Sequence, residues 1–140
     1  MTGTRIVAYV DGGSRGNPGP AGFGVRLEAP DGTLVKEVRG ALGIATNNVA
    51  EYKGLLAALR WAIENGRPAL HVRSDSELLV RQMRGEYKVR NQALRLLHAE
   101  ARRLSALLPR VTFEHVPRAS NAEADRLANL AMDEFEGPSA

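Results

Sequence analysis

The hydrophobic pattern of the chain changes its period near residue 48, and this change narrows the possible folds more than any other feature. Before it, residues 5–11 form an almost continuous apolar run, as in a central strand covered on both faces. Residues 23–28 then alternate apolar with polar side chains, and an Asp-Gly turn leads into residues 34–39. The first third of the chain therefore predicts three antiparallel strands.

Beyond residue 48, apolar side chains recur at helical spacing, and short apolar runs separate the helical segments. Helices are expected over residues 48–64, from 75 to about 83 and over 91–108, and a last helix follows Ser120 and reaches residue 135. Strands are expected at residues 70–74 and 111–116. The order βββαβααβα predicts a mixed five-stranded sheet flanked by helices, an α/β fold of the mixed α+β kind.

Three helix starts carry the pattern of a capping box, in which a polar residue is followed three positions later by glutamate. The pairs are Asn48 with Glu51, Ser74 with Glu77, and Ser120 with Glu123. Each pair is expected to satisfy backbone N–H groups that have no partner within the helix.

Length and composition bound the domain organisation. At 140 residues we expect a single domain over residues 1–135, with 136–140 as a disordered tail. The absence of cysteine excludes disulfides and thiolate metal sites and suits a reducing compartment. No apolar run approaches the roughly 20 residues of a membrane span. We therefore expect a cytoplasmic monomer without a membrane partner.

Basic residues concentrate in one stretch, although the net charge of the chain is only +3. Residues 81–103 hold seven basic residues against two glutamates, which gives a local charge of +5. A solvated helix face explains such a stretch, and so does a binding surface for a polyanion. Both interpretations remain open at this point.

Four carboxylates fall where strands end or helices begin, although each has an alternative role. Asp11 closes the first apolar run, where an uncompensated buried charge is costly. Glu51 fits a capping box equally well, and Asp75 follows strand 70–74 where a helix cap is the alternative. Asp125 lies one turn into the last helix, a position that ordinary surface exposure also explains.

Two strand ends and two helix starts can converge at one point of a small mixed sheet. Two carboxylates about 4 Å apart repel by roughly 4 kcal/mol at an effective dielectric near 20, so a cluster of four would recruit a divalent cation. Carboxylate oxygens favour Mg²⁺, with Mn²⁺ as a substitute. Such a cluster supports two-metal hydrolysis of a phosphodiester, which predicts a metal-dependent nuclease.

Residues 11–24 hold six glycines, more than a tight turn needs. The segment matches neither the dinucleotide-binding nor the Walker A pattern, because a strand rather than a helix follows it. Its backbone can approach a ribose or phosphate closely, and a mobile hairpin loop is the alternative. Residues 46–48, Thr-Asn-Asn, are likewise either a helix cap or contacts to a nucleic-acid backbone.

Four motifs occur along the chain: D-G-G-S-x-G-N-P-G-P-x-G-x-G, T-N-N-x-x-E-Y, S-D-S and N-x-E-A-D-x-L-A. Together they resemble the ribonuclease H type 1 family, from about residue 6 to residue 132. The resemblance implies the ribonuclease H-like fold. It also implies endonucleolytic hydrolysis of the RNA strand of RNA–DNA hybrids by two-metal-ion catalysis, leaving 5′-phosphate and 3′-hydroxyl ends.

The resemblance assigns roles to individual residues. The metal-binding catalytic acids of the family match Asp11, Glu51, Asp75 and Asp125. Gly12, Gly13, Asn17 and Asn48 match positions that contact RNA 2′-hydroxyls or bases in the family. Thr46 and Asn47 match positions that contact DNA phosphate. Ser76 and Arg118 complete the expected substrate-binding residues.

Two departures from the family pattern concern the handling of substrate. Many bacterial members have a longer loop with glycine and histidine before the last acid, whereas residues 116–122 are short and include Arg118. The family's basic protrusion is absent, because only residues 85–90 join the two middle helices. Residues 81–103 would therefore bind the substrate in its place. The chain thus resembles short, archaeal-like members.

Two other functions share parts of this pattern. A non-catalytic nucleic-acid-binding module of the same fold would keep the motifs, but it gains nothing from a repulsive cluster of acids. A 3′-to-5′ exonuclease or junction resolvase of the same broad superfamily would share the acids. We expect the hybrid-specific nuclease, and the products of cleavage distinguish the alternatives.

Overall fold

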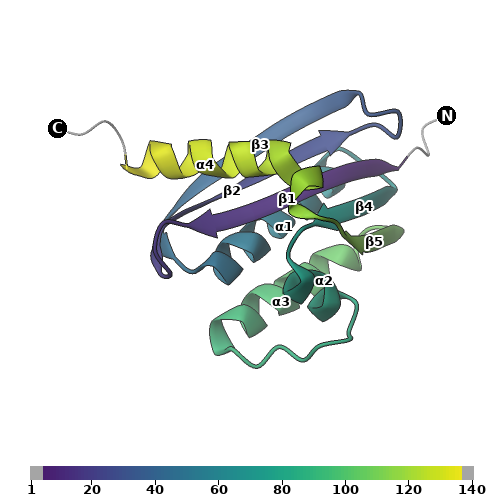
Figure 1. Ribbon diagram of the computed structural model, residues 1–140. Coiled ribbons are helices and arrows are strands. Elements are labelled where there is room, and N and C mark those ends of the chain that lie inside the picture. The colour runs from purple at the N-terminus through teal and green to yellow at the C-terminus, as the bar shows by residue number, and fades with distance from the viewer. Residues whose placement is uncertain (1–4, 137–140) are drawn as a thin grey trace.

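The computed structural model describes residues 5–136, which form five strands, four α-helices and one short 3₁₀ helix (Figure 1). The strands are β1 (Ile6–Ser14), β2 (Gly19–Glu28), β3 (Leu34–Ala45), β4 (Ala69–Ser74) and β5 (Arg110–His115). The helices are α1 (Asn47–Glu64), α2 (Glu77–Met83), α3 (Gln92–Ser105) and α4 (Ala122–Glu136), and the 3₁₀ helix η1 covers Arg118–Asn121. The predicted order of strands and α-helices is confirmed.

The five strands form one mixed sheet in the order β3-β2-β1-β4-β5. Strands β1, β2 and β3 pair antiparallel, as the hairpin pattern predicted, while β4 runs parallel to β1 and β5 runs parallel to β4. Parallel neighbours need long crossover connections, which the helical segments after β3 and after β4 provide. The strand that carries Asp11, β1, therefore lies at the centre of the sheet.

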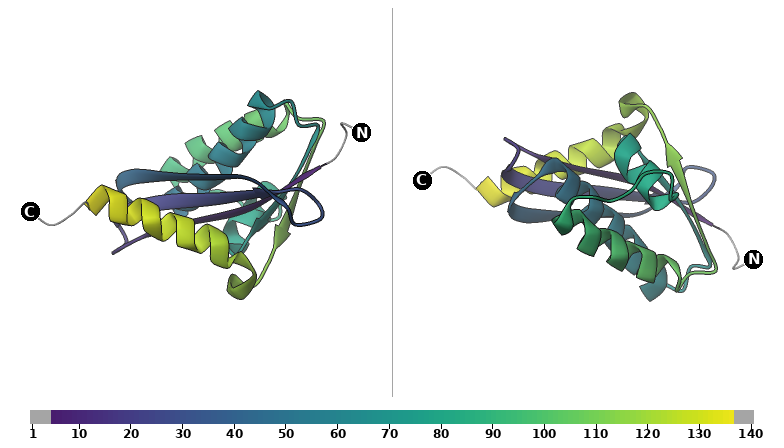
Figure 2. Two further views of the ribbon diagram at one scale, coloured as in Figure 1. Left: turned by 90° about the horizontal axis from the view of Figure 1, so that it is seen from above. Right: turned by 90° about the horizontal axis from the view of Figure 1, so that it is seen from below.

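Helices cover both faces of the sheet (Figure 2). Helix α1 packs against β1, β2 and α3 on one face, whereas α4 lies on the other face across β1, β2 and β3. The main core fills the space between the sheet and α1, where Val10, Leu55, Leu59 and Val72 are fully buried. Burying one such side chain contributes about 1.5–3 kcal/mol, so this layer holds the strand ends in place.

Two glycines let the helices approach the sheet closely. A Cβ added at Gly12 would lie 2.3 Å from the carbonyl carbon of Ala50 in α1. A Cβ at Gly24 would lie 2.4 Å from the carbonyl oxygen of Ala124 in α4. Any side chain at either position would push a helix away from the sheet. These glycines therefore set the distance between the sheet and two acid-bearing helices, a role that the sequence pattern did not predict.

The glycine-rich segment is mostly strand, so the alternative of a mobile loop is wrong for most of it. Gly12 and Gly13 extend β1 beyond Asp11 and pair with Phe23 and Gly22 of β2. Only residues 15–18 connect the two strands. Glycine retains both backbone hydrogen-bonding groups, and the ladder therefore continues past the acid. Strand β3 likewise pairs with β2 beyond its expected end at residue 39.

The helix starts differ from the three predicted capping boxes. Thr46 caps α1, and its Oγ1 accepts a hydrogen bond of 3.2 Å from the N–H of Val49. Ser76 rather than Ser74 caps α2. Ser120 lies inside η1, which precedes α4. In α1 and α2, the capping hydroxyl belongs to the residue directly before the first helical residue. Glu51 is therefore not needed to cap α1.

The ends of two helices also differ from the prediction. Helix α3 stops at Ser105 rather than at residue 108, because the N–H groups of Leu107 and Leu108 bond to carbonyls three residues back. Helix α4 reaches Glu136, the first residue of the predicted tail, and residues 137–140 lie outside the described part of the chain. Within residues 5–136, no helix is long and apolar enough to cross a membrane.

Candidate active site

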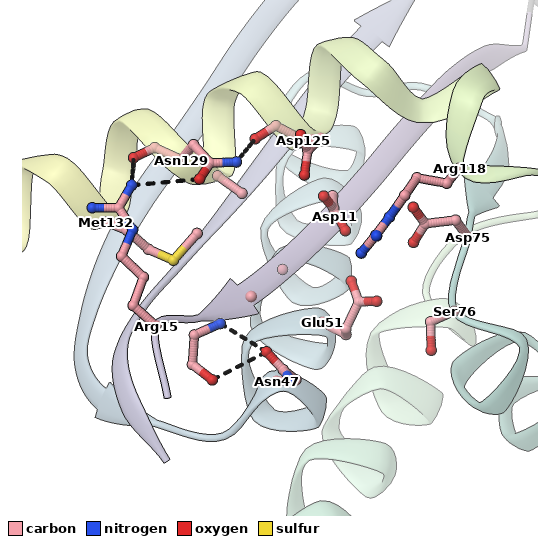
Figure 3. Close-up of a pocket in the computed structure, with 14 residues that line it drawn as sticks. Asp11, Arg15, Asn47, Glu51, Asp75, Ser76, Arg118, Asp125, Asn129 and Met132 are labelled. Atoms are coloured by element: carbon pink, nitrogen blue, oxygen red, sulfur yellow. Dashed lines mark hydrogen bonds between the residues drawn. The ribbon is translucent and has the colours of Figure 1, made fainter. Parts of the chain in front are cut away.

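Two of the four predicted acids lie at neighbouring positions on adjacent central strands (Figure 3). The parallel ladder between β1 and β4 joins Val10 to Ser74. The next residue along each strand is an aspartate, Asp11 in β1 and Asp75 directly after β4. The register of the sheet therefore places these two carboxylates side by side.

The other two acids reach the same point from helices on opposite faces of the sheet. Glu51 lies in α1, which approaches β1 so closely that a Cβ at Gly12 would lie 2.4 Å from the Glu51 backbone nitrogen. Asp125 lies in the first turn of α4, and its side chain is close enough to that of Asp11 to raise the pKa of Asp11. All four acids line one pocket.

Three of the acids lie close enough to share a cation. A carboxylate oxygen from each of Asp11, Glu51 and Asp75 lies within 4.8 Å of the other two. Asp11 exposes only 8% of its surface and Glu51 only 7%. Two charges at this distance repel by roughly 3 kcal/mol at an effective dielectric near 20. The fully ionised cluster is therefore unfavourable without a compensating positive charge.

Burial and mutual repulsion favour the protonated acids. Burial, the charge of Asp75 and the hydrogen bond with Asp125 raise the pKa of Asp11 from 3.8 to about 8. Burial and then the charges of Asp11 and Asp75 raise the pKa of Glu51 well above its usual 4.5. Burial also raises the pKa of Asp75. A divalent cation bound here would therefore displace protons from the cluster.

Arg118 brings one positive charge to the acids. It begins η1, and Figure 3 shows its guanidinium directed toward Asp11, Glu51 and Asp75. The charge of Arg118 lowers the pKa of both Glu51 and Asp75, against the larger effect of burial. One guanidinium leaves most of the negative charge of four carboxylates uncompensated.

The donor atoms fit a hard divalent cation. The Oε1 atom of Glu51 is buried and has no hydrogen-bond partner among the described residues. A buried carboxylate oxygen without a partner is costly unless a cation compensates it. Every ligand of the cluster would be a carboxylate oxygen, the ligand type that Mg²⁺ and Mn²⁺ prefer. Asp11, Glu51 and Asp75 can therefore hold a metal ion.

We expect the metal-free protein to lose stability as the pH rises from about 4 to about 8. Folded Asp11 keeps its proton up to about pH 8, whereas the unfolded chain releases it near 3.8. Because the folded state binds more protons within this window, each rise in pH favours unfolding, and the effect levels off above about pH 8. Thermal unfolding in EDTA at increasing pH measures this slope, which should be smaller in Asp11→Asn. An unchanged slope in that variant would contradict the assignment.

The pocket has a volume of about 500 Å³. Besides the four acids, the expected residues that line it are Gly12, Gly13, Asn47, Ser76 and Arg118. Its lining also includes residues for which no role was predicted: Ser14, Arg15, Ala128, Asn129 and Met132. The last three follow Asp125 at helical spacing, so the period of α4 is a signal that could have identified them.

The remaining expected substrate-binding residues lie beside the pocket rather than in its lining. Thr46 caps α1, and Asn48 is exposed in the first turn of that helix. The Oδ1 atom of Asn17 accepts a hydrogen bond of 3.1 Å from the backbone N–H of Asn47. In turn, Oδ1 of Asn47 accepts one of 2.8 Å from the N–H of Ser14. These bonds fix the β1–β2 hairpin on α1, a structural role that was not predicted for either asparagine.

The basic stretch 81–103 contains both surface ion pairs and a basic pocket. Arg81 pairs with Glu77 at 2.8 Å, and Arg103 pairs with Glu100 at 2.7 Å. A second pocket, of about 440 Å³, is lined by Gln82, Gly85, Tyr87, Lys88, Val89, Arg90, Arg95, His98 and Arg102. No acid belongs to this lining, so part of the stretch is a solvated surface and part is a site suited to anions.

Fold and site together define a class of protein: a mixed-sheet α/β protein whose clustered acids, beside Asp11 of the central strand, can hold a metal ion through carboxylate oxygens. The sequence matches the family described as reverse transcriptase-like over residues 9–131. It is 44% identical to the ribonuclease HI of Halobacterium salinarum over 132 residues, which cover 94% of this chain and 66% of that protein. The chain belongs to the ribonuclease H family.

Solved structures of the family share the fold. The N-terminal ribonuclease H domain of a Mycobacterium tuberculosis protein superposes with a TM-score of 0.91 at 47% identity, covering 95% of this chain and 96% of that one. LC11 ribonuclease H1, in complex with an RNA/DNA hybrid, gives 0.90 at 42% identity, covering 94% and 99%. The chain spans 36% of the length of the mycobacterial proteins that it matches at 48% identity. The predicted fold and family are confirmed.

Proposed function

We propose that this chain is a metal-dependent endoribonuclease that hydrolyses the RNA strand of RNA–DNA hybrids. The observation that carries the proposal is the convergence of four acids from separate parts of the chain in one pocket. A protein that only binds nucleic acid would gain nothing from carboxylates that repel one another and the phosphate backbone. The complex of LC11 ribonuclease H1 with an RNA/DNA hybrid supports the class of substrate.

Magnesium is the proposed cofactor, with Mn²⁺ as a substitute. Asp11, Glu51 and Asp75 would hold one ion, and Asp125, whose side chain lies near that of Asp11, would join Asp11 in holding a second. When bound, the two ions would activate water and stabilise the charge on the leaving oxygen. The four side chains themselves would gather the ions beside Asp11 of β1, and they would release the protons that burial stabilises on them.

The proposed reaction is hydrolysis of one phosphodiester bond. A water oxygen bonds to the scissile phosphorus as the water gives up a proton, and the bond from phosphorus to the 3′ oxygen breaks. The 3′ oxygen takes up a proton, so one product ends in a 3′-hydroxyl and the other begins with a 5′-phosphate. Arg118, which lines the pocket beside the acids, would bind a phosphate oxygen through its guanidinium.

The two strands of the hybrid would be recognised on different sides of the acids. Gly12 and Gly13 would offer backbone groups to RNA 2′-hydroxyls, together with the polar side chains of Asn17, Asn48 and Ser76. Thr46 and Asn47, at the start of α1, would contact DNA phosphate. The basic pocket around Lys88 and Arg95 would hold a further phosphate of the DNA strand. One chain supplies all four acids, so we expect a monomer to be sufficient.

The experiment that tests this proposal follows the products of a hybrid whose RNA strand carries a 5′ label. We expect internal fragments from the first time points, with 3′-hydroxyl ends that a polymerase extends without phosphatase treatment. Stepwise shortening from the 3′ end would instead identify an exonuclease. Binding without cleavage in Mg²⁺ or Mn²⁺ over a broad pH range would identify a non-catalytic binding module.

A further inference from the structure

The hairpin between β1 and β2 is fixed to helices on both sides of the pocket. On the α1 side, Ser14 donates to Oδ1 of Asn47 from its N–H at 2.8 Å and from its Oγ at 3.0 Å. On the α4 side, the contact is made by Arg15 (Figure 3). The hairpin therefore joins the helix that carries Glu51 to the helix that carries Asp125.

Arg15 contacts two residues of α4, Asp133 and Asn129, and Asn129 lines the pocket. Its NH2 atom lies 2.7 Å from Oδ1 of Asp133. The same atom donates to the backbone oxygen of Asn129 at 3.3 Å and to its Oδ1 at 3.4 Å. Asn129 in turn donates from Nδ2 to the backbone oxygen of Asp125 at 3.0 Å. A continuous series of hydrogen bonds thus connects the hairpin to the turn that carries the fourth acid.

The position of these residues distinguishes them from an ordinary surface ion pair. Arg15 and Asn129 both line the pocket that contains the acids. In Figure 3 they lie on the opposite side of the acids from Arg118. The pocket therefore has an arginine on each side, and Arg15 is the one bonded to α4.

We propose that Arg15 is a positioning residue, which holds the Asp125 turn of α4 at a fixed distance from the RNA-facing hairpin. The inference rests on the proposed function, because it concerns the geometry in which the RNA strand would meet Asp125. A displacement of about 1 Å at a reacting centre costs as much as roughly 100-fold in rate. A bond that fixes α4 against the hairpin is therefore expected to affect turnover more than stability.

The stability contribution of this pair is small because both partners are partly exposed. The side chain of Arg15 is 35% exposed and that of Asp133 is 60% exposed. Ion pairs of this kind contribute little to folding in water. Replacing Arg15 by alanine should thus lower the melting temperature by no more than about 4 °C.

Helix α4 offers a matched control one residue away. Glu134 accepts two hydrogen bonds from Arg39, from Nε at 3.1 Å and from NH2 at 2.8 Å. This pair also links an arginine of the sheet region to the end of α4, and its side chains are 43% and 51% exposed. Neither residue lines the acid pocket. The two pairs therefore match in type and exposure and differ in their relation to the site.

The experiment compares Arg15→Ala, Arg15→Lys and Arg39→Ala by melting temperature and by kcat and KM on a labelled hybrid. We expect kcat to fall by roughly 10- to 100-fold in Arg15→Ala, with KM changed by less than about 3-fold. Arg15→Lys should recover part of kcat, because lysine keeps a charge for Asp133 but lacks the guanidinium. In Arg39→Ala, kcat should stay within about 2-fold of its value in the unsubstituted protein.

Amide hydrogen exchange gives a readout that does not depend on activity. In Arg15→Ala, exchange should become faster in the hairpin and over residues 125–129, whereas Arg39→Ala should leave both segments unchanged. Equal kcat in Arg15→Ala and Arg39→Ala, or unchanged exchange over residues 125–129 in Arg15→Ala, would overturn the inference. Failure of the unchanged chain to cleave any hybrid would refute the proposed function alone, and the exchange data would still decide the role of Arg15.

Discussion

Asp11→Asn is expected to reduce cleavage of an RNA–DNA hybrid by roughly 10³-fold or more while the protein stays folded. Asn keeps the size of the side chain but removes the charge that would bind both metal ions. Asp11 is also the acid whose pKa burial and its neighbours raise to about 8, so its replacement relieves repulsion. We therefore expect an equal or higher melting temperature above about pH 8 in the absence of metal.

Initial rates on a labelled hybrid, at saturating Mg²⁺, measure this effect. Asp75→Asn should behave in the same way, since Asp75 belongs to the same triad. The control is Asp31→Asn, at an exposed turn where Oδ1 accepts a hydrogen bond of 3.0 Å from the N–H of Thr33. Asparagine can keep that bond, so activity should not change. Full activity in Asp11→Asn would remove the basis for the assigned site.

Gly12→Ala is expected to destabilise the fold by about 3 kcal/mol and to reduce activity with it. The new methyl group would lie 2.3 Å from the carbonyl carbon of Ala50 and 2.4 Å from the backbone nitrogen of Glu51. Both atoms belong to the backbone of α1, so the helix must move rather than a side chain. Glu51 would move with it, away from Asp11.

Urea denaturation of Gly12→Ala and Gly13→Ala separates this steric effect from the general effect of replacing a glycine. A Cβ at Gly13 would lie 3.5 Å from the terminal methyl of Met132, an ordinary van der Waals contact. Gly13→Ala should therefore change the free energy of unfolding by less than about 1 kcal/mol. Similar losses in the two variants would show that α1 does not depend on the absence of a side chain at Gly12.

The order of strands and helices was predictable because hydrophobic period is a local signal. The helical spacing of Leu56, Leu59 and Ile63 indicates α1 without any knowledge of its partners. The continuous apolar run before Asp11 likewise indicated a strand with neighbours on both sides, and β1 has them. Such patterns do not fix element ends, because a few backbone bonds decide whether β3 stops at residue 39 or continues to Ala45.

The packing role of Gly12 and Gly24 was not predictable, because it depends on which backbone lies opposite each residue. In the sequence, the two glycines look like the others of the segment. In the structure, each faces a helix backbone at a distance that excludes a Cβ. The contacts of Arg15 were not predictable for the same reason, since its partners Asn129 and Asp133 are more than a hundred residues away in the sequence.

For the acids, the sequence supplied the residues but left their alternatives open. Capping remained an equal explanation for Glu51 and Asp75 until the structure showed that Thr46 and Ser76 cap these helices. The β1–β4 register and the approach of α1 at Gly12 then account for their position near Asp11. None of these contacts is encoded in local sequence, which explains why the family motifs were needed to connect the acids.

We have proposed that the acid cluster uses a divalent metal to cut the RNA strand of RNA–DNA hybrids. The most direct test incubates the chain with matched RNA–DNA, RNA–RNA and DNA–DNA duplexes of one sequence, in EDTA and after adding Mg²⁺ or Mn²⁺. We predict cleavage of the RNA strand of the hybrid, no cleavage of the DNA duplex, and complete dependence on added metal. Cleavage that persists in EDTA, or cleavage of the DNA duplex at the rate of the hybrid, would contradict the proposed function.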